Sequence, residues 1–169
     1  MDDASTPPTP QQTADAVRER LFAADRASRG LGMRIVAMAP GAATLAMTVR
    51  DDMLNGHGTC HGGFVAALAD SAFAFACNSH GEPTVAAGFT VDFIAPGRAG
   101  DVLTARCAEV ARAGRTGIYD AEVTNQRGER IAVFRGRSHT LRRAAAAGEV
   151  ATAAELIAPC PSTQEPSCP

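Results

Sequence analysis

The stretch HGGFVAALADSAFAFACNS, which runs from His61 to Ser79, decides the fold of this chain. Apolar residues occupy every face of a helical wheel drawn through it, which predicts a helix that is buried all round. A strongly curved sheet wrapped around one helix would bury it in this way. Asp70 is the only charged side chain between the two ends of the stretch. Burying a carboxylate without partners is costly and raises its pKa, so Asp70 is the first candidate for a functional residue.

Strand-like segments flank this helix on both sides. An earlier helix is expected over Thr13–Arg29, where apolar residues recur at helical spacing. Six strands are expected, at Met33–Ala39, Ala43–Arg50, Val85–Ile94, Asp101–Ala113, Thr116–Gln126 and Arg130–Leu141. Turn-forming residues such as Pro40-Gly41 separate most neighbours. Short turns between consecutive strands predict a mostly antiparallel sheet and therefore an α+β fold.

The composition fits one domain and gives no support to two classes of function. The chain has 169 residues, of which 46% are hydrophobic, enough for a single core. We expect a disordered extension at residues 1–12, one domain at residues 13–141, and a C-terminal helix or flexible tail at residues 142–169. A net charge of −2 gives no reason to bind nucleic acid, and no apolar run is long enough to span a membrane. With no secretory signal and no Cys-x-x-Cys pair, a cytoplasmic protein with reduced thiols is expected.

Asp70 and the glycines before it could form two halves of a site that attacks a carbonyl. Gly62 and Gly63 fall in the first turn of the expected helix, where backbone N–H groups lack intrahelical partners. Without Cβ atoms they would let a substrate carbonyl come close, as in an oxyanion hole. Other interpretations stay open: Asp70 could face a water-filled edge or bind a loop, and the glycines could simply cap the helix. Ser71 could orient Asp70 or be a small core hydroxyl.

The spacing of the two halves predicts an oligomer. Gly62 and Asp70 are eight residues apart, which corresponds to ~12 Å along a helix. A carbonyl under attack needs its oxygen near the N–H and its carbon about 3 Å from the attacking group. A single helix cannot serve both atoms, whereas an antiparallel helix from a second copy can. If both groups act on one bond, the minimum assembly is a homodimer.

The sequence resembles the PaaI-type thioesterases of phenylacetate degradation. The resemblance rests on NGHGTCHGG at residues 55–63, LADSAFAFACN at residues 68–78, VDFIAP at residues 91–96 and GRTGIYD at residues 114–120, and it covers about Leu31 to Leu141. It implies a hotdog fold, in which an antiparallel sheet wraps around one long helix, paired into dimers and usually assembled into homotetramers. It also implies hydrolysis of phenylacetyl-CoA or hydroxyphenylacetyl-CoA thioesters, with no metal and no cofactor.

The resemblance also assigns roles to individual residues. Asp70 would be the nucleophile or the general base, because direct attack and activation of water both suit a partly desolvated carboxylate. The Gly62 N–H would polarise the thioester carbonyl, Asn55 would place the carbonyl or the attacking water, and His61 would orient the loop or the substrate. The residues expected to contact substrate are Gly63, Phe64, Ser71, Phe93, Arg115 and Thr116.

Several of these residues also have ordinary structural interpretations. Arg115 could meet CoA phosphates, because a guanidinium group fits phosphate oxygens in a fork, or it could be a solvated surface charge. Phe64 and Phe93 could line the acyl pocket or belong to the core.

Competing functions remain open at this point. His57, Cys60 and His61 lie within five residues, but a zinc site needs further ligands that no second cluster nearby supplies. Cys60 and His61 are adjacent, and adjacent residues rarely face each other as a nucleophilic pair. A hotdog hydratase or dehydratase would use His61 with Asp70 for proton transfer. A non-catalytic acyl-CoA-binding module would have no need for an acid in its central helix.

Overall fold

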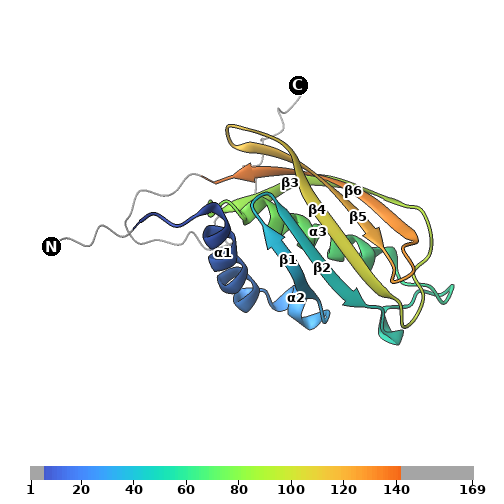
Figure 1. Ribbon diagram of the computed structural model, residues 1–169. Helices are drawn as coiled ribbons and strands as arrows, with labels where there is room; N and C mark the ends of the chain where they lie inside the picture. The colour runs from blue at the N-terminus through green and yellow to red at the C-terminus, as the bar shows by residue number, and fades with distance from the viewer. Residues whose placement is uncertain (1–5, 142–169) are drawn as a thin grey trace, which may run out of the picture.

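A six-stranded antiparallel sheet curves around one long helix in the computed structural model, which describes residues 6–141 (Figure 1). The strands are β1 (Arg34–Ala39), β2 (Ala42–Thr48), β3 (Thr84–Phe93), β4 (Val102–Ala113), β5 (Thr116–Thr124) and β6 (Arg130–Thr140). Their order across the sheet is β1-β2-β4-β5-β6-β3. The helices are α1 (Pro10–Ala24), α2 (Arg26–Gly30) and α3 (Gly62–Asn78), and a short 3-10 turn spans Asp51–Met53. The predicted α+β hotdog arrangement is confirmed.

The N-terminal helix begins earlier than the sequence suggested and is broken in two. Thr9 caps α1, because its side chain accepts a hydrogen bond from the Gln12 N–H while the Gln12 side chain accepts one from the Thr9 N–H. Residues 10–12, expected in the disordered extension, therefore belong to α1. Asp25 then interrupts the expected helix and caps α2 through Ser28 N–H. The helix or tail expected at residues 142–169 lies outside the described residues.

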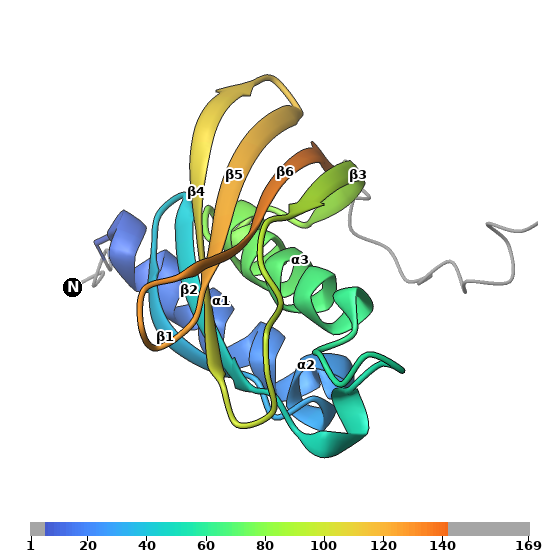
Figure 2. The ribbon, with the colours of Figure 1, turned by 90° about the vertical axis from the view of Figure 1, so that its right-hand side faces the viewer.

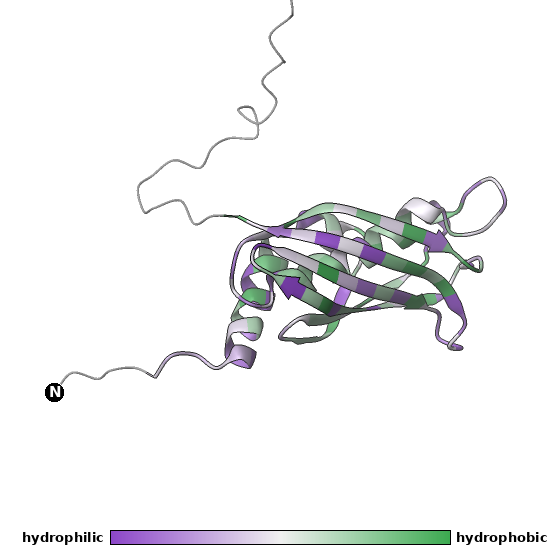
Figure 3. Cartoon of the chain, turned by 90° about the horizontal axis from the view of Figure 1, so that it is seen from above, coloured by the Kyte–Doolittle hydropathy of each residue, from purple (hydrophilic) through white to green (hydrophobic). Residues whose placement is uncertain are grey.

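The core lies between α3 and the concave face of the sheet. Leu68, Ala72 and Phe73 on α3 are fully buried, and the Phe73 ring lies 5.4 Å from the ring of Tyr119 on β5. A Cβ atom at Gly136 would lie 2.9 Å from Phe73 Cζ, so this glycine lets β6 approach the helix closely. Irregularities in four strand pairings, including one between Ala86 and Gly88, increase the bend of the sheet. The strands alternate between hydrophobic and hydrophilic residues, as the pleat requires (Figure 3).

The expectation that α3 is buried on every side is wrong for a single chain. The sheet covers one side of the helix, and α1 and α2 cover a second side (Figure 2). Phe22 of α1 packs against Phe75 with ring centroids 6.1 Å apart. A remaining stripe at four-residue spacing is only partly buried and consists of Gly62, Ala66, Asp70 and Ala74. Composition alone could not reveal this stripe, because most of it is alanine and glycine.

Strand β3 leaves a second apolar surface uncovered beside that stripe. It pairs only with β6, so its other edge has no strand partner in the described chain. Several large apolar residues on or next to it are well exposed: Val85 (46%), Phe89 (44%), Phe93 (54%) and Ile94 (59%). An apolar edge strand of this length is a template for pairing with another chain. Among the described residues, none of the helices has the length and apolar character needed to span a membrane.

Candidate active site

The loop before α3 is shaped by hydrogen bonds from two of the predicted site residues. Asn55 Oδ1 accepts from the N–H groups of His57 (2.9 Å) and Thr59 (3.3 Å), and its Nδ2 donates to Thr59 Oγ1 (3.0 Å). His61 caps the helix, because its Nδ1 accepts from the Gly63 N–H at 3.0 Å. The Gly63 N–H is therefore occupied within the chain. Both polar side chains fix the position of the helix N-terminus.

Gly62 is left with a free backbone donor at this terminus. Its N–H makes no hydrogen bond within residues 6–141, and it lies where the helix dipole is positive. A Cβ atom at Gly62 would lie 2.8 Å from Phe93 Cζ, so any larger residue would displace that ring. Gly62 and Phe93 line a cavity of about 480 Å³ that we call the loop pocket. Its lining is Asn55, Thr59, Cys60, Gly62, Val65, Phe93, Ile94, Ala95, Pro96, Gly97 and Ile131.

Asp70 lies two turns further along α3 and lines a different cavity. Its carboxylate makes no hydrogen bond or ion pair within the described residues, and burial raises its pKa above the ordinary value. The cavity, which we call the helix pocket, has a volume of about 450 Å³. Its lining is Leu21, Ala24, Asp25, Asp70, Phe73, Ala74, Phe75, Cys77, Asn78, Thr84, Val85 and Ala86. The lining is mostly apolar, which suits an acyl group.

The structure thus separates the two halves that the sequence analysis paired. Gly62 and Asn55 line the loop pocket, whereas Asp70 lines the helix pocket. Both Gly62 and Asp70 lie on the partly buried stripe of α3, ~12 Å apart along the helix. One chain alone does not bring them to the same bond.

Other predicted contact residues lie away from both cavities. Ser71 Oγ is 2.9 Å from Ser28 Oγ, so it joins α3 to α2 and does not orient Asp70. Phe64 is partly buried against the core, with its ring edge-on to His61 at 6.4 Å. Arg115, in the turn between β4 and β5, and Thr116, the first residue of β5, are exposed and line neither pocket. Leu21 and Ala24, which line the helix pocket, were not predicted there, because helical spacing does not say which neighbour a helix faces.

The sulfur and imidazole groups near the loop are not arranged as a metal or nucleophile site. Residues 6–141 contain no cluster of three or more metal-ligating side chains. Burial raises the pKa of the Cys60 thiol, and its Sγ lies 3.7 Å from the His61 carbonyl oxygen rather than against the imidazole. A neutral buried thiol is a poor nucleophile.

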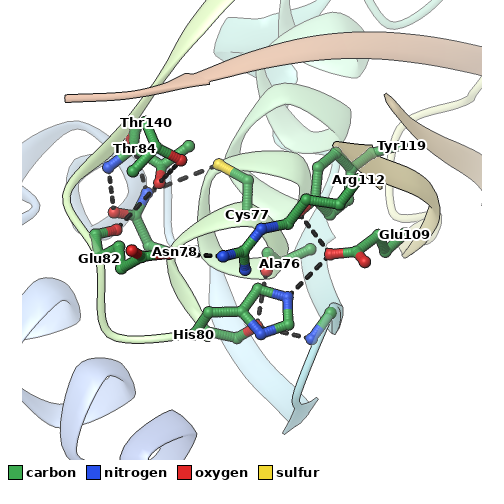
Figure 4. A network of polar contacts seen from close by, with 12 residues as sticks. Ala76, Cys77, Asn78, His80, Glu82, Thr84, Glu109, Arg112, Tyr119 and Thr140 are labelled. Atoms are coloured by element: carbon green, nitrogen blue, oxygen red, sulfur yellow. Dashed lines mark hydrogen bonds and ion pairs between the residues drawn. The ribbon is translucent and has the colours of Figure 1, made fainter. Parts of the chain in front are cut away.

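A second polar cluster closes the other end of α3 (Figure 4). Glu109 Oε2 accepts a hydrogen bond from Tyr119 OH at 2.8 Å and lies 2.8 Å from His80 Nε2. Ser79 Oγ accepts from the Gly41 N–H and donates to the Ala76 carbonyl, both at 2.7 Å. This cluster ties the end of α3 to β4, β5 and the turn between β1 and β2.

Comparisons with known proteins fit this geometry. Residues 57–132 match the family model of the Thioesterase superfamily. The chain is 48% identical over 131 residues to acyl-coenzyme A thioesterase PaaI of Escherichia coli (strain K12). The aligned region covers 77% of this chain and 90% of that protein. The structure of the E. coli PaaI protein from the phenylacetic acid degradation operon has a TM-score of 0.78 at 42% identity, covering 79% of this chain and 97% of that chain. The structure of a hypothetical thioesterase of Streptococcus pneumoniae TIGR4 with coenzyme A has a TM-score of 0.62 at 25% identity. That match covers 64% of this chain and 87% of the other.

Proposed function

This chain belongs to the thioesterase superfamily as a PaaI-type thioester hydrolase, and on that premise we propose that it hydrolyses acyl-CoA substrates of the phenylacetyl or hydroxyphenylacetyl type to the free acid and CoA. The observation that carries the proposal is the state of Asp70. Its carboxylate is partly buried, has no hydrogen-bond partner in the described chain, and faces an apolar cavity of acyl-group size. Such a group is poorly placed for stability and well placed for reaction.

One backbone group and one side-chain group carry out the chemistry in this proposal. The thioester oxygen accepts a hydrogen bond from the Gly62 N–H, which stabilises the negative charge that develops there. Asp70 then either attacks the carbonyl carbon to form a mixed anhydride, which water hydrolyses, or takes a proton from the water that attacks. In both routes the carbon–sulfur bond breaks and CoA leaves as a thiolate, a stable anion that does not require a strong general acid. The reaction as proposed uses neither metal nor cofactor.

The active unit is a homodimer in which each site draws on both chains. The uncovered edge of β3 would pair with the same edge of a second copy, and the small residues Ala66 and Ala74 would let two antiparallel α3 helices approach. That arrangement would place Asp70 of one chain opposite Gly62 of the other. Two such dimers would form the proposed tetramer.

The remaining site residues support substrate placement in this proposal. Asn55 and His61 hold the loop so that Gly62 presents its N–H. One N–H of Asn55 Nδ2 donates to Thr59 Oγ1, and its second N–H can donate to the attacking water or to the substrate carbonyl. The Phe93 ring packs on Gly62 and would cover the bound thioester. Arg115 and Thr116, exposed where β5 begins, would meet the CoA phosphates at the surface.

Release of CoA thiol tests the reaction directly. Purified protein should release thiol from phenylacetyl-CoA, and Asp70→Asn should abolish this release while binding of CoA is retained. Water addition to an enoyl-CoA, without thiol release, would instead identify a hydratase that uses His61 and Asp70. Binding of acyl-CoA without either reaction would identify a non-catalytic module.

Mixed dimers test whether the site is shared. Gly62→Pro removes the donor and displaces the Phe93 ring of its own chain, and proline is tolerated at the first helical position. Asp70→Asn removes the carboxylate. A hybrid of the two chains contains one intact shared site and one doubly defective site, so it should recover about half of the wild-type activity per dimer. If verified heterodimers stay inactive, the two groups act within one chain.

A further inference from the structure

Helix α1 forms one side of the helix pocket that Asp70 opens into. Leu21 and Ala24 from its last turn line this cavity together with the middle of α3 and the start of β3. The cavity follows α3 from Asp70 to Asn78, a span of ~12 Å. It is therefore longer than an acetyl group requires, and α1 bounds its width.

The polar groups at the far end of this cavity are already engaged. Asn78 Nδ2 donates to the Ala74 and Thr84 carbonyls (2.9 and 2.8 Å), and Asn78 Oδ1 accepts from the Thr84 N–H (3.0 Å). Asp25 Oδ1 accepts from the Ser28 N–H at 2.9 Å, where it caps α2. Beyond Asp70, then, the surface that meets an acyl group is set by apolar side chains, and shape rather than hydrogen bonding decides which group fits.

Three contacts hold α1 and α2 in place as a fixed wall. The Phe22 ring packs on Phe75, and Ser28 Oγ meets Ser71 Oγ at 2.9 Å. Gln11 Nε2 donates to the Met38 carbonyl at 3.1 Å, which anchors the start of α1 to β1. A wall fixed in this way limits the size of the acyl group.

We propose that Leu21 and Ala24 of α1 are specificity-determining residues, and that the acyl group lies along α3 between Asp70 and Asn78. This inference rests on the function proposed above. Ala24 is the sharper determinant, because its side chain is exposed at the rim of the cavity and its methyl group leaves the entrance wide. An aryl or medium-length acyl group can then enter, and a larger residue at position 24 would exclude it while a short acyl group still fits.

Ala24→Leu tests the proposal, with Ala23→Leu as a matched control. Both alanines are exposed in the last turn of α1, but Ala23 lines a different cavity between α1 and β1. The added volume and the change in helix propensity are the same, so only the side of the helix differs. The kcat/KM for phenylacetyl-CoA and for propionyl-CoA should be measured for wild type and both variants, with Tm to confirm folding.

The expected result is a change in substrate ratio for one variant only. Ala24→Leu should lower kcat/KM for phenylacetyl-CoA at least about tenfold relative to propionyl-CoA, since a few methylenes in an apolar pocket have effects of this size. Ala23→Leu should leave the ratio unchanged. An unchanged ratio in Ala24→Leu would overturn the inference while leaving the proposed function intact. A wild type that releases no thiol from phenylacetyl-CoA would instead refute the proposed function.

Discussion

The two ends of α3 differ in how their polar groups are used. At the C-terminal end, Asn78 and Ser79 place their side-chain polar atoms in hydrogen bonds within the chain, and Glu109 receives two contacts at 2.8 Å. In the other half, the Gly62 N–H and the Asp70 carboxylate have no partner among residues 6–141. Among residues 6–141 as a whole, every fully buried side-chain nitrogen or oxygen atom has a hydrogen-bond partner. The C-terminal end therefore fastens the helix, and the N-terminal half keeps a donor and an acid free to bind.

Asp70 on α3 and Glu109 on β4 show the same contrast in the direction of their pKa shifts. Burial is the cause of the raised pKa of Asp70. Burial acts in the same direction on Glu109, but hydrogen bonds with Tyr119 and His80, together with the charges of His80 and Arg112, outweigh it and lower the pKa of that carboxyl. Hydrogen bonds to a carboxylate stabilise its charged form. One acid is thus stabilised as an anion by its neighbours, and the other is poised to react.

Replacing each acid by its amide should give the largest difference between the two ends. Asp70→Asn should lower kcat for thiol release roughly 10²- to 10⁴-fold, the range lost with a general base or nucleophile. Glu109→Gln, the same change at the other end, should leave kcat within about twofold, because it touches the fold and not the substrate. Steady-state kinetics on phenylacetyl-CoA measure both. Equal losses in the two variants would contradict the division of the helix into a fastened end and a reactive half.

The next largest effect should come from adding one methyl group at the N-terminus of α3. In Gly62→Ala the new Cβ would meet the Phe93 ring at 2.8 Å, so the ring must move and the carbonyl loses its close approach. We expect kcat/KM to fall roughly 10- to 100-fold, since misplacement of about 1 Å has this effect.

Gly56→Ala is the control for this methyl group. Gly56 lies in the same loop, and a Cβ atom there would have no neighbour within 4 Å. Its kcat/KM should match wild type. Similar losses in both variants would mean that loop flexibility, and not the space over Gly62, limits the reaction.

A third change tests the fastened end through stability. Ser79→Ala removes the acceptor of the buried Gly41 N–H and the donor to the Ala76 carbonyl. An unsatisfied buried group costs about 1–3 kcal/mol, so the free energy of unfolding should fall by that amount in urea denaturation. The kcat should stay at the wild-type value. A large loss of kcat without loss of stability would show that this end also takes part in the reaction.

Much of this architecture could be predicted from local sequence, and the rest depends on partners that the sequence does not name. The strand-like segments between turn-forming residues predicted β4, β5 and β6 to within a few residues, because turn residues mark the ends of a strand in the local sequence. Asp70 could also be identified from the local sequence, because it is the only charged side chain in an otherwise apolar helix. The open stripe through Ala66 and Ala74 and the wall formed by Ala24 were not predictable, since an alanine looks the same whether it meets a sheet, a pocket or another chain. Ser71 was assigned to substrate although it binds Ser28, because a serine hydroxyl does not reveal its partner.

The smallest expected effect is on stability, and it tests the contrast between the two acids most directly. Asp70→Asn and Glu109→Gln should change Tm in opposite directions. The pKa of Asp70 is higher in the folded chain than its ordinary value of 3.8. The folded state therefore holds this proton more tightly than the unfolded state, and stability falls as pH rises through the window from 3.8 up to the raised pKa. Above the raised pKa the penalty is complete, so Asp70→Asn should raise Tm there, and the gain should vanish as pH falls through that window. Glu109, whose folded pKa is lowered, stabilises the fold at neutral pH, so Glu109→Gln should lower Tm there. Thermal melts of both variants at neutral pH and near pH 4, at one protein concentration, measure this. Shifts of the same sign would mean that Asp70 has a stabilising partner, in which case the carboxylate is not free and the reactive half of the helix has been assigned wrongly.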